Sequence, residues 1–189
     1  MKILKNIIED WRREIMNKVA QFEKVSLEQF KKDMLDTFNG MYTEDEIEGI
    51  YETIKLPKRA TKGSAGYDFY THIPFSLEPK HNIKIPTGIK VKMDNDWVLQ
   101  IFPRSGLGFK YKVQLENTVG IVDSDYVNSD NEGHIFIKIT NDNNEGKSVH
   151  LKEGDGFAQG IFLQYGITTD DDADGVRNGG FGSTSKKTL

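Results

Sequence analysis

The sequence predicts an all-β core preceded by a helical segment, and three observations support this fold class. From Leu56 onward the apolar residues follow a period of two, Gly, Pro, Asn and Asp separate the short apolar runs, and no helical pattern lies between them. Short strands without intervening helices are typical of an antiparallel sandwich or barrel. Residues 1–53, by contrast, show helical spacing. The 189 residues suffice for one ordinary domain with an appendage.

The helical segment is predicted to contain three helices. Apolar residues recur every three or four positions between residues 4 and 22, which indicates an amphipathic helix. Ser26 followed by Gln29 predicts a capping box that starts a second helix, and Asn39-Gly40 predicts its end. Thr43, with a glutamate three residues later, predicts the start of a third. Acidic and basic residues nearly balance here, so we interpret the segment as a packing or oligomerisation appendage and not as a DNA-binding unit.

The β core is predicted from the change of period after the helical segment. Ile83 and Ile85 flank Lys84, and Asp94-Asn95-Asp96 supplies a turn between two later strands. Strands are predicted at residues 83–85, 89–93, 97–102, 134–139, 147–151 and 157–164. The chain therefore divides into a helical N-terminal extension at 1–53, a β-rich core at 54–168, and an acidic linker with a flexible C-terminal arm at 169–189.

The composition excludes several classes of protein. No apolar run approaches membrane-spanning length, so no membrane association is expected. A net charge of −4 disfavours a general nucleic-acid binder, so an anionic ligand should be met by a few placed cations. Without cysteine the chain has no disulfide and no thiolate chemistry. This is compatible with a reducing cytoplasm, which is the compartment we expect.

Residues 177–184 combine groups that suit closure over a nucleotide. Arg177 can neutralise phosphate, and glycine amides with Ser183 and Thr184 can hydrogen-bond phosphate oxygens. Phe181 offers a flat face to a base. The simpler interpretation is a frayed chain end, which is common. The choice between a closing arm and a frayed chain end therefore depends on the segments upstream.

Three short segments upstream place polar side chains where predicted strands begin or end. Asp68 ends a glycine-bounded turn, and Gln159 enters a strand after another turn. Arg104 and Ser105 follow a proline that ends a strand, so both can point at one anion. Each segment taken alone is an ordinary turn with solvated side chains. Only their combination favours a binding site.

Residues 117–126 form the strongest single segment. Asp123 lies near a tight turn between apolar residues, which makes it a candidate general base for a water molecule. Asn117 and backbone groups of the same hairpin could read the edge of a base, and the ring of Tyr126 could pack against a sugar. The alternative is a plain β-hairpin in which the aspartate only forms the turn.

In their order along the chain, these five segments resemble the five motifs of the trimeric dUTPase family. The resemblance covers about two thirds of the chain and leaves out the helical first third. The matching stretches are Ala65-Gly66-Tyr67-Asp68, Pro103-Arg104-Ser105-Gly106, Asn117 to Tyr126, Gly154 to Gln159, and Gly179 to Thr184. Family members hydrolyse dUTP to dUMP and pyrophosphate. The resemblance therefore implies that activity, a jelly-roll-like β core, and a homotrimer with shared active sites.

The resemblance also implies a role for each matching residue. Asp123 would position and activate the water that attacks the α-phosphorus, and Tyr126 would pack under the deoxyribose and disfavour a 2′-hydroxyl. Mg²⁺ would sit on the triphosphate, largely bound by water, with Asp68 as an outer-shell partner. The other substrate-binding residues would be Asn117, Gly120, Val122 and Phe181 for uracil, and Arg104, Ser105, Gly106, Gln159, Arg177, Gly182, Ser183 and Thr184 for the phosphates or the closing arm.

Three features depart from the family pattern, one of which is Gly156 at a position of the fourth motif where the family commonly has arginine. The fifth motif is one residue shorter between Arg177 and Phe181, and residues 127–133 predict a longer hairpin after the third motif. Two alternatives stay open. A dCTP deaminase of the same fold would need an acid/base glutamate and typically lacks the Gly-Phe-Gly arm. A regulatory protein would keep the nucleotide site and hold a protein partner with its N-terminal helices.

Overall fold

The structure confirms a mostly β protein with a few helices. The computed structural model describes residues 18–177. Its strands are β1 (Ala20–Lys24), β2 (Lys58–Arg59), β3 (Tyr67–Tyr70), β4 (Phe75–Leu77), β5 (Asn82–Pro86), β6 (Ile89–Met93), β7 (Trp97–Pro103), β8 (Val113–Leu115), β9 (Gly120–Val122), β10 (Phe136–Asn141), β11 (Val149–Leu151) and β12 (Gly156–Gln164). Its helices are α2 (Leu27–Phe38), α3 (Glu44–Thr53), α4 (Ser105–Tyr111) and the short 3-10 helix η1 (Ser124–Asn128).

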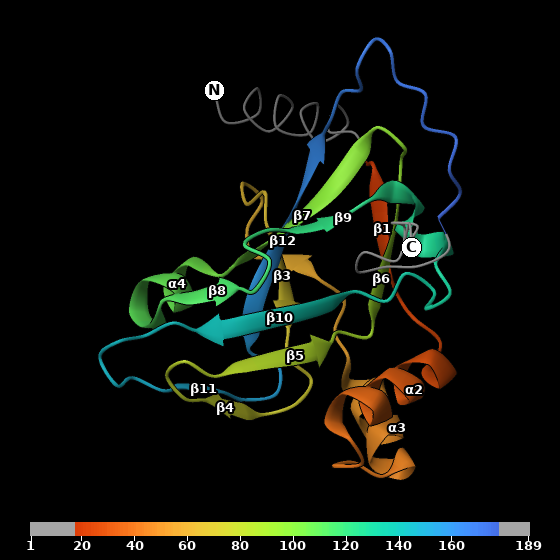
Figure 1. The fold of residues 1–189 in the computed structure, drawn as a ribbon. Coiled ribbons are helices and arrows are strands. Elements are labelled where there is room, and N and C mark those ends of the chain that lie inside the picture. Colours follow the sequence, from red (N-terminus) through yellow and green to blue (C-terminus); the bar gives the residue numbers. More distant parts are fainter. Residues whose placement is uncertain (1–17, 178–189) are drawn as a thin grey trace, which may run out of the picture.

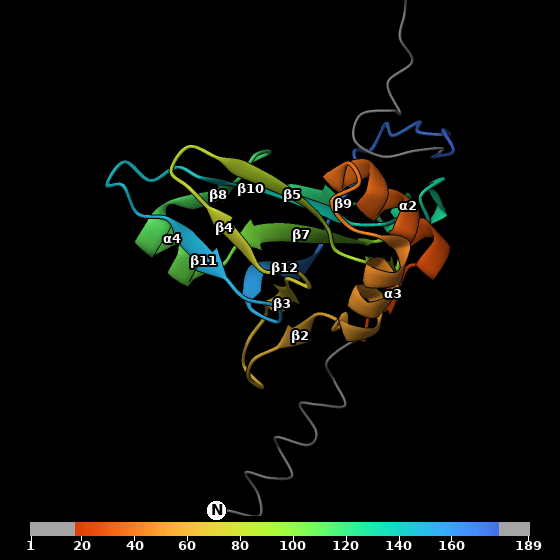
Figure 2. The same ribbon diagram turned by 90° about the horizontal axis from the view of Figure 1, so that it is seen from below.

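Two sheets lie in separate layers, as Figure 2 shows. The larger sheet has the strand order β2-β3-β12-β7-β9, and the smaller has the order β5-β10-β8. The remaining strands form two pairs, β1 with β6 and β11 with β4. Neighbouring strands in all of them run antiparallel. The predicted antiparallel sandwich is therefore confirmed, and the described strands do not close into a barrel.

The period of two in the sequence places one face of each strand in the core. On β10, Ile137 and Ile139 are buried while Lys138 between them is exposed. On β6, Ile89 and Val91 are buried in the same way. Helices α2 and α3 lie at one end of the strands and α4 lies at the other (Figure 1). The sheets thus supply a rigid frame for the loops that connect them.

The second and third predicted helices are confirmed together with their caps. Ser26 accepts a hydrogen bond from the backbone amide of Gln29 at the start of α2, and Asn39 ends this helix with φ of 49°. The side chain of Gln29 does not complete the capping box, because the amide of Ser26 donates to Glu132 instead. Thr43 forms a complete capping box at the start of α3. No helix among residues 18–177 is long and apolar enough to cross a membrane.

The first predicted helix is wrong at its C-terminal end. Residues 20–24 form strand β1, which pairs with β6 from Ala20 opposite Met93 to Lys24 opposite Ile89. Phe22, placed by its spacing on a helical face, instead packs its ring against Phe69 at 5.8 Å. The edge of β6 offers backbone partners, and this tertiary pairing overrides local spacing. The rest of that predicted helix lies outside the described residues, apart from residues 18 and 19, which are not helical.

The two helices share the hydrophobic core of the sheets. Phe30 of α2 and Ile47 of α3 are fully buried in the same cluster as the strand residues. Burial of such a side chain contributes about 1.5–3 kcal/mol. Gly88, in the turn between β5 and β6, has φ of +73°, and a Cβ atom there would lie 2.4 Å from Cδ1 of Ile54. The end of the helical segment therefore packs directly on this turn. A protein partner for these helices stays a prediction.

A buried histidine lies where the helices meet the sheets. His72 is 4% exposed, and its ring makes an edge contact with Phe30 at 5.3 Å between ring centroids. Neither ring nitrogen of His72 has a hydrogen-bond partner within residues 18–177. Burial, with a smaller contribution from His134, lowers the pKa of His72 to about 4. The side chain is therefore neutral at pH 7.

Candidate active site

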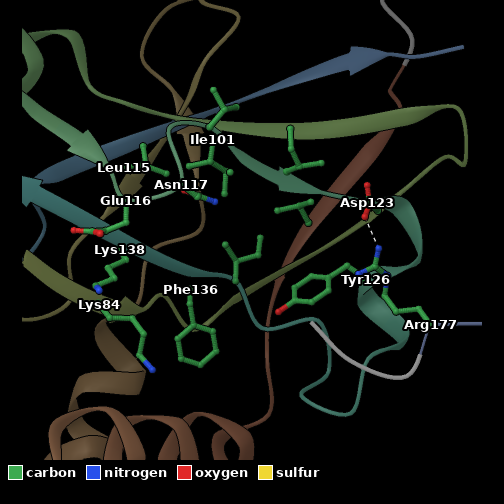
Figure 3. Close-up of a pocket in the computed structure, with 15 residues that line it drawn as sticks. Lys84, Ile101, Leu115, Glu116, Asn117, Asp123, Tyr126, Phe136, Lys138 and Arg177 are labelled. Atoms are coloured by element: carbon green, nitrogen blue, oxygen red, sulfur yellow. Dashed lines mark hydrogen bonds and ion pairs between the residues drawn. The ribbon is translucent and has the colours of Figure 1, made fainter. Parts of the chain in front are cut away.

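The predicted residues of the third motif line a cavity of about 510 Å³ (Figure 3). The cavity is bounded by the β8–β9 connection, by η1 and by strands β5 and β10. It brings together the following residues predicted for the site: Asn117, Gly120, Val122, Asp123, Tyr126 and Arg177. Residues that are neighbours in the third motif therefore also lie around one cavity.

The β8–β9 connection is a tight turn that exposes Asn117. Thr118 has φ of 66°, and its backbone amide donates to the carbonyl of Leu115 at 3.0 Å. The amide of Val119 donates to the carbonyl of Asn117 at 2.7 Å. Gly120 then starts β9, where a Cβ atom would lie only 3.1 Å from Cβ of Ile101. The turn therefore holds Asn117 on a backbone of defined shape at the cavity wall.

Asp123 and Tyr126 are placed by the 3-10 helix η1. Asp123 directly precedes the helix, and its carbonyl accepts from the amide of Tyr126 at 3.1 Å. The side chain of Asp123 is 48% exposed, whereas Tyr126 is 8% exposed. Burial raises the pKa of the Tyr126 hydroxyl, and the hydrogen bond from Asn131 only partly offsets this. The site thus pairs a solvent-accessible carboxylate with a fixed aromatic ring.

Arg177 closes one side of this cavity. Its Nη2 forms an ion pair with Oδ2 of Asp123, and its Nε donates to Oδ1 of Asp125 at 2.7 Å. The guanidinium carbon also lies 5.8 Å from the ring centroid of Tyr126. Figure 3 shows Asp123, Tyr126 and Arg177 together on one side of the cavity. This cation therefore contacts the candidate base of the same chain.

The residues of the first, second and fourth motifs line a second pocket of about 320 Å³. Asp68 lies on β3 opposite Gln159 of β12, and Arg104 directly follows β7. Nε of Arg104 lies 3.2 Å from Oδ1 of Asp68, and the side-chain Nε2 of Gln159 donates to the carbonyl of Pro103 at 3.1 Å. Three strands of one sheet thus place one cation, one carboxylate and one amide in a single pocket.

Gly156 and Gly66 leave room for these side chains. The carbonyl of Gly156 accepts from Nη1 of Arg104 at 3.3 Å, and a Cβ atom at Gly156 would lie 2.6 Å from that nitrogen. A Cβ atom at Gly66 would lie 2.7 Å from Oε1 of Gln159. Ser105 also lines the pocket, and Gly106 is exposed in the first turn of α4. A side chain at Gly66 or Gly156 would therefore displace the end of Gln159 or of Arg104.

The part of the chain that contains both pockets matches a known protein family. A family model described as dUTPase matches residues 52–185, well over half of the chain. The chain belongs to the dUTPase family. The matched range contains both pockets and begins near the end of α3, so α2 and β1 lie outside it. Family membership thus agrees with the order of the five motifs.

Curated relatives and solved structures support the same assignment to the dUTPase family. The deoxyuridine 5′-triphosphate nucleotidohydrolase of Lactococcus lactis subsp. lactis is 39% identical over 134 residues, which is 69% of this chain and 88% of the relative. The Desulfitobacterium hafniense enzyme of the same name is 38% identical over 138 residues, which is 69% of this chain and 87% of the relative. The Streptococcus mutans dUTPase structure matches with a TM-score of 0.56 and 31% identity, over 78% of this chain and 97% of that one. The dUTPase of phage phi11 of S. aureus shares the fold at 19% identity, with a TM-score of 0.56 over 84% and 97% of the two chains.

The first four predicted motifs of this dUTPase family member form two groups within residues 18–177. The two pockets have no lining residue in common. Phe181, Gly182, Ser183 and Thr184 of the fifth motif lie outside the described residues. The motifs therefore identified residues that lie close together in the fold. The order of the motifs did not predict which of these residues share a pocket.

Some lining residues of the larger cavity were not predicted from the sequence. Lys84 of β5 and Lys138 of β10 pair directly across the strands, and both line the cavity together with Phe136. Figure 3 shows the two lysines with Glu116 away from Asp123. The alternation of lysine with isoleucine in both strands was the available signal, because it places the lysines on the face opposite the core.

Proposed function

We propose that the protein hydrolyses dUTP to dUMP and pyrophosphate, which limits uracil in DNA and supplies dUMP. The observation that carries the proposal is the cavity in which Asp123 lies beside Asn117 and Tyr126, within the range matched by the dUTPase family model. Relatives at 38–39% identity bear the name deoxyuridine 5′-triphosphate nucleotidohydrolase. The roles below are proposals for the individual residues of this chain.

Asp123 acts as the general base. Its half-exposed carboxylate is accessible to a water molecule. The carboxylate takes a proton as the water oxygen attacks the α-phosphorus, a new P–O bond forms, and the bond from the α-phosphorus to the bridging oxygen of the β-phosphate breaks. Pyrophosphate leaves with that oxygen. Arg177 pairs with the same carboxylate, so a bound triphosphate would compete with Asp123 for this guanidinium.

Asn117, the β9 backbone and Tyr126 select the nucleoside. The turn at Asn117 and the backbone at Gly120 and Val122 offer fixed donors and acceptors for uracil. A wrong base would leave such groups unpaired, which gives strong discrimination. The ring of Tyr126 packs under the deoxyribose and disfavours a 2′-hydroxyl. Phe181 stacks on the base when the arm closes.

The second pocket receives the phosphates. Arg104, Ser105, Gly106 and Gln159 supply the charge and the hydrogen-bond donors that a polyphosphate needs. The arm residues Arg177, Gly182, Ser183 and Thr184 add donors on closure. Fixed cations and donors stabilise charge that develops on the pyrophosphate leaving group.

The residues of this pocket fit Mg²⁺ that arrives on the triphosphate. Residues 18–177 contain no group of three or more His, Asp or Glu side chains that could hold a metal ion. Asp68 is a single carboxylate, and it already pairs with Arg104. Mg²⁺ keeps several waters and is usually bound by one or two carboxylates together with substrate phosphates. We therefore assign Asp68 as an outer-shell partner, and the ion would neutralise phosphate charge when bound.

A homotrimer would join the two pockets into complete sites. Within one protomer the nucleoside-selecting residues and the phosphate-binding residues line separate pockets. One dUTP molecule must reach both, so we propose that adjacent protomers supply them and that a third supplies the closing arm. This arrangement predicts that a monomer has no complete site.

Pyrophosphate release from dUTP, dTTP, dCTP and UTP with Mg²⁺ tests the activity. We expect rapid release from dUTP and slow release from the other three. Ammonia release from dCTP would instead indicate a deaminase. Protein that leaves dUTP unchanged under these conditions would contradict the proposed function.

Mixed trimers test the sharing of sites. Protomers with Asp123→Asn and protomers truncated after Asp174 should each be nearly inactive alone. Mixed trimers of the two should regain activity, because some sites then combine an intact Asp123 with an intact arm from another protomer. Verified mixed trimers without any recovery would contradict shared sites.

A further inference from the structure

We propose that the helical segment positions the tyrosine of the nucleotide cavity through Asp33, His134 and Asn131. The inference rests on the proposed function, because it takes Tyr126 as the residue under the deoxyribose. Asp33 lies before residue 52, where the match to the dUTPase family model begins. The segment would therefore add to the site a set of positioning residues that the matched family core does not contain.

The hydroxyl group of Tyr126 is held from two sides. It donates to the carbonyl of His134 at 2.9 Å and accepts from Nδ2 of Asn131 at 3.0 Å. Oδ1 of Asn131 in turn accepts from the amide of Gly133 at 3.2 Å. Because Tyr126 is 8% exposed, loss of either bond would leave a buried polar group without that partner. The ring orientation thus depends on residues 131–134.

His134 is in turn fixed by the helical segment. The residue is fully buried, with Nδ1 at 2.5 Å from Oδ2 of Asp33 and Nε2 accepting from the amide of Gly88 at 2.7 Å. Since Nε2 accepts, Nδ1 carries the proton and donates to Asp33. Gln29 also donates to Asp33, at 2.8 Å. Both ring nitrogens are therefore engaged, and α2 determines where the carbonyl of His134 lies.

A second connection joins the start of α2 to the same turn. The amide and the hydroxyl of Ser26 both donate to the carboxylate of Glu132, which also pairs with Lys90 at 3.0 Å. Burial alone would raise the pKa of Glu132, but the hydrogen bonds from Ser26 and the charge of Lys90 lower it overall. A Cβ atom at Gly133 would lie 2.5 Å from Cα of Val127. The turn therefore packs directly on the residue after Tyr126.

These contacts link α2, the turn at 129–134 and Tyr126. A shift of α2 moves His134 and Glu132, and the hydroxyl of Tyr126 follows. The expected result is control of substrate choice, because the ring separates deoxyribose from ribose only if it stays close under the sugar. Weakening the link should therefore lower the preference for dUTP over UTP more than it lowers turnover of dUTP.

The test compares kcat/KM for dUTP and for UTP in variants of the full-length protein. Asp33→Ala and Asn131→Ala should each lower the dUTP-to-UTP ratio about fivefold, the effect of one lost hydrogen bond. Asp33→Asn keeps an acceptor for Nδ1 and should retain most of the ratio. Combining Asp33→Ala with Tyr126→Phe should lower the ratio no further than Tyr126→Phe alone, since both act through the same hydroxyl.

Lys31→Gln is the matched control. Lys31 lies on α2 beside Asp33 in sequence, but it pairs with Glu44 and Glu48 of α3. This variant removes the exposed ion pairs between α2 and α3 and leaves the bonds from Asp33 and Ser26 to residues 132–134 in place, so the ratio should not change.

If Asp33→Ala fails to fold, Ser26→Ala takes its place, because it removes one hydrogen bond between the start of α2 and the turn at 129–134. An unchanged ratio in the α2 variant or in Asn131→Ala, with wild-type protein that hydrolyses dUTP, overturns the inference, whereas wild-type protein without dUTP turnover overturns the proposed function itself.

Discussion

Acidification should weaken the fold through His72. The pKa of this buried side chain is about 4, against an ordinary value of 6.5. Between these two pH values the unfolded chain binds a proton and the folded chain does not, so stability is complete above about pH 6.5 and falls as the pH is lowered. The difference of about 2.5 pKa units, at 1.36 kcal/mol each, gives a loss of roughly 3 kcal/mol that is complete near pH 4. This is a large share of the stability of a typical domain.

Urea unfolding followed by tryptophan fluorescence measures this loss. We compare wild-type protein with His72→Leu from about pH 7.5 to about pH 4.5, at one protomer concentration because association also stabilises. Carboxylates contribute equally to both proteins, so the difference between their free energies of unfolding isolates His72. That difference should shift by roughly 2.5 kcal/mol in favour of His72→Leu over this pH range, because the loss is not yet complete at about pH 4.5. The exposed His81 provides the control His81→Gln, which should follow wild-type protein. A difference for His72→Leu that stays constant with pH would refute the reasoning.

Three further predictions concern the site. Asp123→Asn should keep nucleotide affinity, measured by calorimetry, and lower kcat at least about a hundredfold because the base is lost; near-normal kcat would exclude that role. Phe181→Ala should lower kcat/KM for dUTP about tenfold through lost stacking on the base, with an unchanged melting temperature; unchanged kinetics would argue against the closing arm. Gly156→Ala should raise KM for dUTP severalfold, because a Cβ atom 2.6 Å from Nη1 displaces Arg104; an unaltered KM would show that Arg104 is not needed in its present place.

Helix caps were the most reliable part of the sequence interpretation. Ser26, Asn39 and Thr43 mark the ends of α2 and α3 as predicted, because capping depends on residues within one turn of the helix end. Strand β1 was missed for the opposite reason. Over five residues a period of two is hard to tell from helical spacing, and its pairing with β6 depends on residues about 70 positions away in sequence.

In the candidate site, too, residues close together in sequence could be predicted, whereas contacts between residues far apart in sequence could not. The motifs identified Asp123, Asn117 and Tyr126 because they lie within ten residues of one another. The family resemblance implied sites shared between protomers, but sequence order carries no information on which strands lie side by side, so it did not assign Arg104 and Asp123 to different pockets. The hydrogen bond from His134 to Asp33 joins residues 101 positions apart, and no pattern in the sequence around His134 indicates this partner.

The contact between Gly88 and Ile54 has a consequence for how such a chain can evolve. A gene fusion that brought residues 18–53 to another member of the family would deliver the helices without the surface that receives them. The recipient would need a glycine at the position of Gly88, a histidine at that of His134 and an acid at that of Glu132 at the same time. Hybrids that exchange N-terminal segments between relatives should therefore fold only when those three positions are inherited with the segment.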